Sequence, residues 1–369
     1  MEATKELYNE RITRIKKAIK LEKNDRTPVI PFVDAFLATA TGVKLSDFVL
    51  DLNKSHEVMI DGTKLLGDID AASGSCSTAQ LSGMICLSNL KLPGRELPDN
   101  MLWQIDEREV MTTDDYDTIL NNGFEVFQAN YHSTRINVDL AAVGEWALKC
   151  PQFDKDMKDE GYPIYLGGAI SHPIDYLSGG RTMGKFMVDL RRMPDKIEAV
   201  MDVITDANIK AMKQVVKNAV EPVTVFVAMA RACPDFYNPK MWERFIWKYL
   251  KKITEAIIET GIPASFHVDA NWERGLDYFR EFPKGTCVFE TDGTTDIYKI
   301  KEKLGDRMCI KGDVHAAKLA LGTPDEVYNY STQLIKDMGT GFILSSGCSV
   351  PANAKLENVK AMIAAATGK

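Results

Sequence analysis

The sequence predicts an α/β fold, a barrel in which eight parallel strands alternate with helices. Short β-branched and apolar runs alternate with amphipathic helical patterns from residue 160 to the end of the chain. Six strand-like runs lie in that part, and two weaker ones precede it. Eight strand–helix units that close on themselves form a (β/α)8 TIM barrel, so we expect residues 1–369 to make one barrel domain.

The expected strands follow one another at regular intervals. The six clear runs are YPIYLGGAI (162–170), PVTVFVAMA (222–230), PASFHVDA (263–270), GTCVFETDG (285–293), RMCIKGDV (307–314) and GFILSSGC (341–348). The two weaker runs are RTPVIPFV (26–33) and GDIDAAS (67–73). Helical patterns separate them, as in TPDEVYNYSTQLIKDMG, which opens with the capping residue Thr323 and closes with Gly339.

Two segments depart from this alternation. Residues 1–25 contain the charged amphipathic stretch ELYNERITRIKKAIK, which predicts a helical lead-in to the barrel. Residues 81–106 resemble a β-hairpin inserted between the second and third strands.

Composition excludes several classes of protein. The chain has 45% hydrophobic and 26% charged residues and a formal charge of −7, so it lacks the basic balance of a non-specific nucleic-acid binder. No apolar run approaches the roughly 18 residues of a membrane span, and no signal peptide is evident. Seven cysteines without a CxxC pair favour a reducing compartment. We therefore expect a cytoplasmic protein.

Chemically active side chains gather at the ends of the expected strands. His267 and Asp269 end the fifth strand, Glu290 and Asp292 the sixth, Asp313 the seventh and Cys348 the eighth. The carboxyl ends of the strands carry the active site in barrels of this kind. Nitrogen, sulfur and oxygen donors that meet there predict a zinc site with one open position.

Each of these residues also has a structural interpretation. Cys348 fits equally well as a small buried apolar residue, and a single histidine usually serves as a buried hydrogen-bonding group. Asp292 or Asp296 in ETDGTTD suits the cap of a following helix. The coincidence of His267, Cys348 and nearby carboxylates at equivalent strand ends favours the metal site.

Two further features are weaker signals. Arg231 follows the fourth strand and either binds an anionic group of a substrate or pairs with a neighbouring carboxylate. SGGRTMGKF (178–186) is rich in glycine and opens a helix, as a phosphate-binding loop does. It lacks the GxGxxG and GxxxxGK spacings, so an ordinary turn is favoured.

The sequence resembles the uroporphyrinogen decarboxylase superfamily over nearly its whole length. The resemblance rests on three stretches: ERITRIKKAIKLEKNDRTPVIPF, LSGGRTMGKFMVDLRRMPDKIEAVMD and IKGDVHAAKLALGTPDEVYNYSTQLIKDMGTGFILSSGCSVPANAKLENVKAM. The last is the most specific, with a GDV strand, a GTPDEV helix start and GC-x-x-P followed by ENVKAM. The fold of this superfamily is a (β/α)8 barrel.

Two branches of the superfamily imply different reactions. The decarboxylases carry arginine just after the first strand, where this chain reads PFVDAFLATATG. The zinc-dependent methyltransferases exchange methyl groups with corrinoid proteins, and their thiol-alkylating members use His-x-Cys and a distant Cys. Here His267 and Cys348 match that pattern, but Asp269 takes the middle position. FHVDANWERGLDYFREFPKG followed by ETDGTTD resembles the methyltransferase components of O-demethylases instead.

The resemblance implies a methyltransferase that moves a methyl group from an aryl methyl ether to the reduced cobalt of a separate corrinoid protein. Zinc would be held by His267, Cys348 and a carboxylate, for which Glu290 is preferred over Asp269. Asp269 and Asp313 are the candidate proton relays. The expected substrate-binding residues are Met229, Arg231, Asn271 and Trp272.

Three alternatives remain open at this point. The methyl group could pass between a corrinoid protein and a thiol or tetrahydrofolate. The barrel could instead be a decarboxylase, which needs no metal, or a non-catalytic partner of a corrinoid protein. Bound zinc would distinguish the methyltransferases from the other two.

Overall fold

Six parallel strands form a curved sheet in the order in which they follow one another in the chain. In the computed structural model, which describes residues 2–369, they run in the order β3 to β8. Their bounds are β3 (Leu166–Ser171), β4 (Thr224–Met229), β5 (Ala264–Val268), β6 (Cys287–Thr291), β7 (Cys309–Val314) and β8 (Phe342–Ser346). Each coincides with one of the six clear strand-like runs, so this part of the barrel is confirmed.

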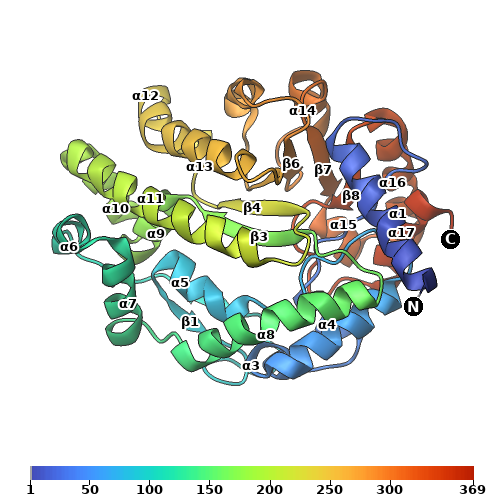
Figure 1. The fold of residues 1–369 in the computed structure, drawn as a ribbon, viewed down its shortest axis with the longest axis horizontal. Helices are drawn as coiled ribbons and strands as arrows, with labels where there is room; N and C mark the ends of the chain where they lie inside the picture. Colours follow the sequence, from blue (N-terminus) through green and yellow to red (C-terminus); the bar gives the residue numbers. More distant parts are fainter. Residues whose placement is uncertain (1) are drawn as a thin grey trace.

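Helices precede, separate and cover these strands (Figure 1). Before β3 lie α1 (Glu2–Ile19), α2 (Ala35–Ala40), α3 (Leu45–Leu50), α4 (Leu52–Leu66), α5 (Ser82–Cys86), α6 (Asp114–Asn122), α7 (Phe124–Thr134) and α8 (Leu140–Asp159), with the short turn η1 (Ala79–Leu81). After β3 lie α9 (Pro173–Arg181), α10 (Met183–Arg192), α11 (Pro194–Asn218), α12 (Pro239–Trp242), α13 (Lys248–Ile258), α14 (Ile297–Leu304), α15 (Ala316–Leu321), α16 (Pro324–Met338) and α17 (Leu356–Thr367), with η2 (Pro234–Phe236), η3 (Glu243–Trp247) and η4 (Glu273–Glu281).

The two weaker runs close the ring between β8 and β3 without forming regular strands. They are named the first bridging run (26–33) and the second bridging run (67–73). Val29 makes a parallel bridge to Leu344 on β8, and Ala72 makes one to Ile164, just before β3. Between the two runs, the N–H of Asp70 donates to the carbonyl of Val29 at 2.9 Å. Pro28 and Pro31 flank the first bridge and have no N–H to continue a ladder, which explains why a strand pattern yields only single bridges here.

The expected lead-in and hairpin are both present. Helix α1 occupies most of residues 1–25, and β1 (Asn89–Lys91) pairs antiparallel with β2 (Gln104–Asp106) as a separate two-stranded sheet. The first residues of the 81–106 segment form α5 rather than a strand. None of the helices in the described part of the chain is long and apolar enough to cross a membrane.

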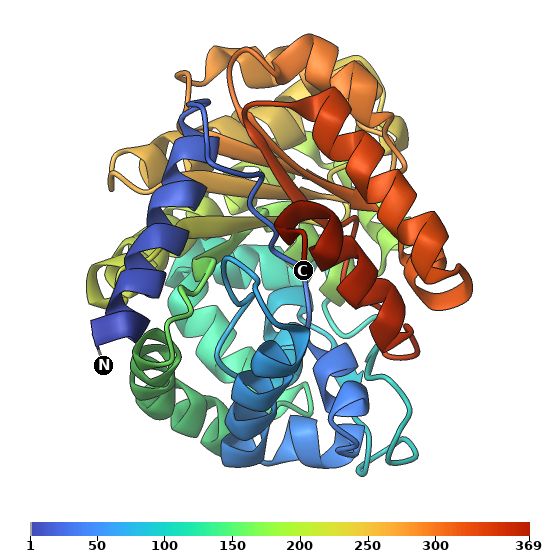
Figure 2. The same cartoon turned by 90° about the vertical axis from the view of Figure 1, so that its right-hand side faces the viewer.

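A small apolar cluster fills the amino end of the barrel, and α1 covers that end. Ile15, Ala18 and Ile19 of α1 pack in one cluster with barrel residues that include Tyr165 and Val288. Figure 2 faces the side of the molecule on which α1 lies. The larger apolar cluster lies outside the ring, between strands and helices. The amino end of the barrel is therefore closed, and polar side chains collect toward the carboxyl end.

The glycine-rich stretch 178–186 serves close packing. A Cβ added to Gly179, near the end of α9, would lie 1.9 Å from the carbonyl oxygen of Cys86 on α5. The inserted segment can approach α9 only because no side chain stands there. The structure thus favours the structural interpretation of this stretch over a phosphate loop.

Gly179→Ala is expected to destabilise the fold by about 3 kcal/mol, since neither backbone can give way without moving an element. Gly184→Ala is the matched control, because a Cβ on that helical glycine of α10 meets nothing within 4 Å. The control should be neutral or more stable by up to about 1 kcal/mol. Urea unfolding followed by tryptophan fluorescence measures both. Equal stability of the two variants would contradict the packing argument.

Candidate metal centre

Three neighbouring strands place His267, Glu290 and Lys311 side by side inside the barrel. His267 on β5 is the register partner of Glu290 on β6, and Glu290 is the partner of Lys311 on β7. All three residues are buried. Alternation along β5 sets their direction, because Phe266 points the other way and packs against Phe279 outside the ring.

A histidine, an aspartate and a cysteine converge one level higher, at the carboxyl ends of the strands. Nε2 of His267 lies 3.7 Å from Sγ of Cys348 and 3.8 Å from Oδ1 of Asp269. One ligand atom from each side chain lies within 4.8 Å of the other two. Nitrogen, sulfur and oxygen donors suit Zn²⁺, whereas Mg²⁺ and Ca²⁺ favour oxygen alone. Three protein ligands leave the fourth tetrahedral position for water or a substrate.

Gly347 brings Cys348 into this group. A Cβ on Gly347 would lie 2.7 Å from the carbonyl oxygen of Asp292, so only glycine lets the chain pass this close to the end of β6. The N–H of Gly347 donates to the carbonyl of Val314 at 3.0 Å, which fixes the turn to the end of β7. The side chain of Cys348, just after the last strand, therefore points toward His267.

Glu290 contacts Nδ1 of His267, on the side of the ring opposite Cys348. Its Oε2 lies 3.4 Å from Nδ1 of His267 and 3.2 Å from Nζ of Lys311. The hydroxyl of Ser265 donates to Oε1, and Tyr165 shares a hydrogen bond of 2.9 Å with Ser265. A carboxylate on Nδ1 keeps the proton there and leaves Nε2 free to bind a metal.

The charges of the group suit a cation. Burial alone would lower the pKa of His267, but the hydrogen bonds to Cys348 and Glu290 and their negative charges raise it to about 10. Burial would raise the pKa of Glu290, but the charge of Lys311 and the hydrogen bond with His267 lower it to about 2. Negative groups thus outweigh Lys311 around the imidazole, and a metal ion would balance them.

The family resemblance favours Glu290 over Asp269 as the third ligand, whereas the geometry favours Asp269. Glu290 pairs in register with His267 and therefore lies at the same level, beside Nδ1. Asp269 is two residues further along β5 and reaches the level of Cys348, beside Nε2. Burial raises the pKa of Asp269, which a bound cation would offset.

Trp272 contacts the backbone of the metal group, which consists of His267, Asp269 and Cys348. It is fully buried, and its Nε1 donates to the carbonyl of Asp269 at 2.8 Å. Met229 is likewise buried in the apolar core. The sequence predicts that Met229 and Trp272 bind substrate, but neither side chain is exposed at the barrel mouth. Asn271 is half-buried, and its side chain accepts from the N–H of Glu273 at 3.0 Å.

The remaining predicted residues are held by other partners. Asp313 accepts a hydrogen bond of 2.8 Å from Tyr330 on α16. Arg231 donates to the carbonyl of Ser178 at 2.9 Å and to Glu107 at 3.2 Å. Arg231 thus follows the second of its two interpretations, pairing with a carboxylate. Asp292 organises its loop by accepting from the N–H of Ala270 at 2.9 Å. The helix cap is the other candidate, Asp296, whose side chain accepts from the N–H of Tyr298 at the start of α14.

Two phenylalanines that the sequence analysis did not single out flank His267. The ring of Phe32, from the first bridging run, and that of Phe226, on β4, both lie 5.4 Å from the imidazole centroid. Both residues are half-buried. Phe32 lies two residues before Asp34, and Phe226 lies two residues before Ala228. Residues two apart in a strand share a face, so this spacing was the signal in the sequence that both rings point into the barrel. Two aromatic rings thus contact the imidazole, and Phe226 pairs in register with Ser265, two residues before His267 on β5.

Asp175, in the first turn of α9, is expected to make stability depend on pH. It is buried, its Oδ1 accepts from the N–H of Arg231 at 3.0 Å, and its Oδ2 has no hydrogen-bond partner among the described residues. Burial raises its pKa to about 7, against an unfolded value of about 3.9. The native state keeps this proton while the unfolded state releases it. Its contribution to stability is therefore lost as the pH rises from about 4 to about 7.

Asp175→Asn removes this titration. The unfolding free energy of the variant, relative to the wild type, should rise by about 2–4 kcal/mol between pH 4 and pH 7. Urea titrations at a series of pH values measure the difference. Asp139→Asn, at an exposed cap of α8, should show a nearly constant difference. A flat difference for Asp175→Asn would mean that the carboxyl is ionised throughout.

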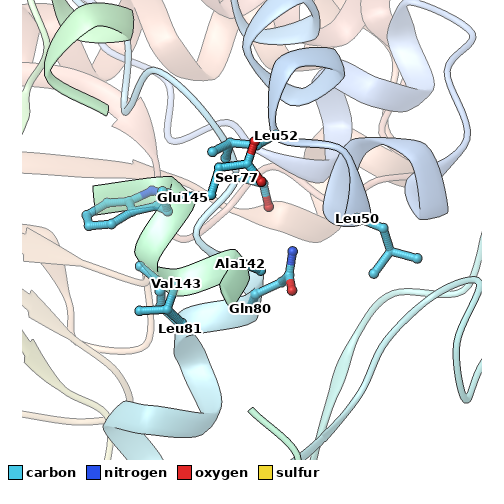
Figure 3. Close-up of a pocket in the computed structure, with 9 residues that line it drawn as sticks. Leu50, Leu52, Ser77, Gln80, Leu81, Ala142, Val143 and Glu145 are labelled. Atoms are coloured by element: carbon cyan, nitrogen blue, oxygen red, sulfur yellow. The ribbon is translucent and has the colours of Figure 1, made fainter. Parts of the chain in front are cut away.

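Two hollows lie elsewhere on the molecule. The one in Figure 3 has a volume of about 20 Å³, enough for about one water molecule, and is lined by Leu50, Leu52, Ser77, Gln80, Leu81, Ala142, Val143, Glu145 and Trp146. The other, of about 330 Å³, lies at the amino end of the barrel beside Arg26, Pro28 and Gly341. Neither includes a residue of the metal group.

Comparison with known proteins gives a matching family and several relatives. The family model described as Uroporphyrinogen decarboxylase (URO-D) matches residues 165–368, more than half of the chain. Methylcobamide:CoM methyltransferase MtbA of Methanosarcina acetivorans is 25% identical over 167 residues, 45% of this chain and 48% of that protein. Uroporphyrinogen decarboxylase of Coxiella burnetii is 22% identical over 200 residues, 52% of this chain and 53% of that protein. The chain spans about half the length of these curated relatives.

One solved structure is similar over almost the full length. A methyltransferase from Methanosarcina mazei superposes with a TM-score of 0.73, and the match covers 96% of this chain and 97% of that one. The two sequences are 17% identical, so the likeness speaks for the fold. It agrees with the barrel expected from the alternation of strands and helices.

Proposed function

Because the chain belongs to the uroporphyrinogen decarboxylase family, we propose that it is a zinc-dependent methyltransferase of this family rather than a decarboxylase. The observation that carries the proposal is the group of His267, Asp269 and Cys348 at the mouth of the barrel. Decarboxylation needs no metal and gives no reason for such a group. Relatives named methylcobamide:CoM methyltransferase point to a corrinoid protein as the partner.

The cations of the site argue against a substrate with many carboxylates. Lys311 is buried against Glu290, and Arg231 is tied to Glu107 and Ser178. The segment PFVDAFLATATG after the first bridging run contains no arginine. A tetrapyrrole with several propionates would therefore bring carboxylates to a mouth whose nearby basic groups are already paired.

The methyl donor that we propose is an aryl methyl ether. Phe32 and Phe226 flank His267 with half-buried rings, and aromatic rings favour edge or offset contacts with another ring. Such a surface would place an aryl group beside the open coordination position. The acceptor is the reduced cobalt of a corrinoid protein.

The geometry supports a role for each of these residues in the proposed reaction. His267, Asp269 and Cys348 would hold Zn²⁺, which when bound supplies Lewis acidity toward the ether oxygen. Glu290 orients the imidazole through Nδ1, and Lys311 neutralises Glu290. Trp272 fixes the carbonyl of Asp269 and so the start of the loop that carries it. Phe32 and Phe226 orient the ring and keep water from the reacting methyl group.

The relatives also favour a second candidate, methyl transfer between a corrinoid protein and a thiol. The two candidates differ in which compound gives or takes the methyl group. One assay mixes the metal-loaded protein with cob(I)alamin and methoxybenzenes, and follows methylcobalamin by absorbance and the phenol by chromatography. A parallel assay offers methylcobalamin and coenzyme M.

Phenol and methylcobalamin in equal amounts would support the proposed reaction. Turnover only in the thiol assay would replace it with the second candidate. Loss of carboxyl groups from a porphyrinogen, with no methyl transfer in either assay, would overturn both.

A further inference from the structure

The carboxyl group of Asp34, at the barrel mouth, makes few polar contacts. Asp34 directly follows the first bridging run and precedes α2. The only hydrogen bond of its carboxyl group within residues 2–369 is accepted from the N–H of Ala35 at 2.5 Å, and no basic side chain of these residues pairs with it. The residue as a whole is half-buried.

Asp34 directly follows a run that hydrogen bonds to β8 and to the turn after Cys348. The N–H of Phe32 donates to Oγ of Ser346 at 3.1 Å, so these two residues lie at one level. Asp34 is two residues beyond Phe32, and Cys348 is two residues beyond Ser346. The N–H of Val350 donates to the carbonyl of Phe32 at 2.8 Å, which holds the turn after Cys348 against this run. The ring of Phe32 contacts His267 directly.

Five other carboxyl groups on or near the strand ends have different tasks. Asp269 belongs to the metal group, and Glu290 is held by Lys311 and Ser265. Asp313 is bound by Tyr330, and Asp292 accepts from Ala270 and Thr294. Asp175 is covered by protein and cannot touch a substrate.

We propose that Asp34 is the general acid that protonates the oxygen of the departing phenol. The inference rests on the proposed function and names a catalytic residue for it. As methyl transfer proceeds, the C–O bond of the ether breaks and its electron pair stays on oxygen. The electron pair of Co(I) in the corrinoid partner forms the new Co–C bond. The carboxyl of Asp34 gives its proton to the phenolate oxygen and regains one from solvent, so protons and electrons balance.

The acidity of Asp34 is suited to this task. Burial raises its pKa to about 6, only partly opposed by the hydrogen bond from Ala35. About a tenth of the molecules would carry the proton at pH 7, and the acid would be far stronger than water. An aspartate with an ordinary pKa would be almost wholly ionised there.

The test compares leaving groups in Asp34→Asn. Asparagine caps helices about as well as aspartate and has nearly the same size, so α2 should be kept while the acid is lost. With methoxybenzene donors whose phenols are weak acids, the variant should lose about 100-fold in kcat. With 4-nitroanisole, whose phenolate leaves without help, the loss should fall to within about 3-fold. Zinc content and thermal unfolding should match the wild type.

Asp139→Asn is the matched control, because Asp139 also caps a helix and lies on the exposed surface. It should leave the kcat for both donors unchanged. An equal loss with both donors in Asp34→Asn would mean a positioning role and overturn the acid. Wild-type rates with both would also overturn it while leaving the proposed function intact. Failure of the wild type to demethylate any aryl ether would remove the proposed function and this inference with it.

Discussion

Cys348→Ser is expected to lose its zinc and, with it, more than about 1,000-fold of the methyl-transfer rate. The thiolate is the strongest donor in the group, and a serine hydroxyl does not ionise at neutral pH to replace it. Changes to mere partners of ligands already cost 10–100-fold in affinity, so loss of the ligand itself should exceed about 100-fold. The measurement is elemental analysis after dialysis, followed by chelator competition for the dissociation constant.

A second thiol provides the control for this substitution. Cys150, on α8, is half-buried like Cys348 but contacts Ser75 and Asp154 away from the metal group. Cys150→Ser should keep one zinc per chain and the wild-type rate. If Cys348→Ser also keeps its zinc with unchanged affinity, the cysteine is not a ligand, and the donor set must be reassigned.

Lys311→Met is expected to destabilise the barrel by about 3 kcal/mol. Lys311 and Glu290 are each about 4% exposed, and removal of one partner leaves the other as a buried charge. His267 compensates in part, because it lies on the same carboxylate. The expected loss is therefore at the lower end of the range for broken buried pairs. Denaturant unfolding of the metal-free protein measures it without a contribution from bound zinc.

The double variant Lys311→Met, Glu290→Gln isolates the pair. It should recover part of the stability, because no unpaired carboxylate remains. Lys303→Met tests an exposed pair instead, since Lys303 and Asp277 are 46% and 68% exposed. That variant should change stability by less than about 1 kcal/mol. A loss of the same size in Lys303→Met and Lys311→Met would contradict a special role of burial.

The strand ends could be predicted from the sequence because they follow from local patterns. The six regular runs contain apolar and β-branched residues over at least one strand length, and all six are strands. His267 and Cys348 end two of these runs, and their approach follows from strand ends meeting at one mouth. The ring closure by Val29 and Ala72 was less evident, because proline and aspartate interrupt those runs.

The choice between the two carboxylates and the surroundings of Arg231 and Trp272 depend on the level of a residue in the barrel and on distant partners. Glu290 and Asp269 both end strands, and only the register shows that Glu290 lies level with His267. Arg231 pairs with Glu107, a residue 124 positions earlier and just after the inserted segment, and no local pattern reveals this pairing. Trp272 has the composition of a pocket wall, but packing against Trp242 and Phe279 buries it.

The closure of the ring has a consequence for how this protein is made. The run that carries Phe32 meets β8 across more than 300 residues of chain, in contacts such as Phe32 with Ser346. Contacts of this span form late in folding, because the loss of chain entropy precedes their gain. Until then the free edges of β3 and β8 are open to wrong pairing, and Cys348 has not reached His267. Metal capture should therefore report the completion of the barrel, and a chain that lacks its last strand should remain unable to hold the ion.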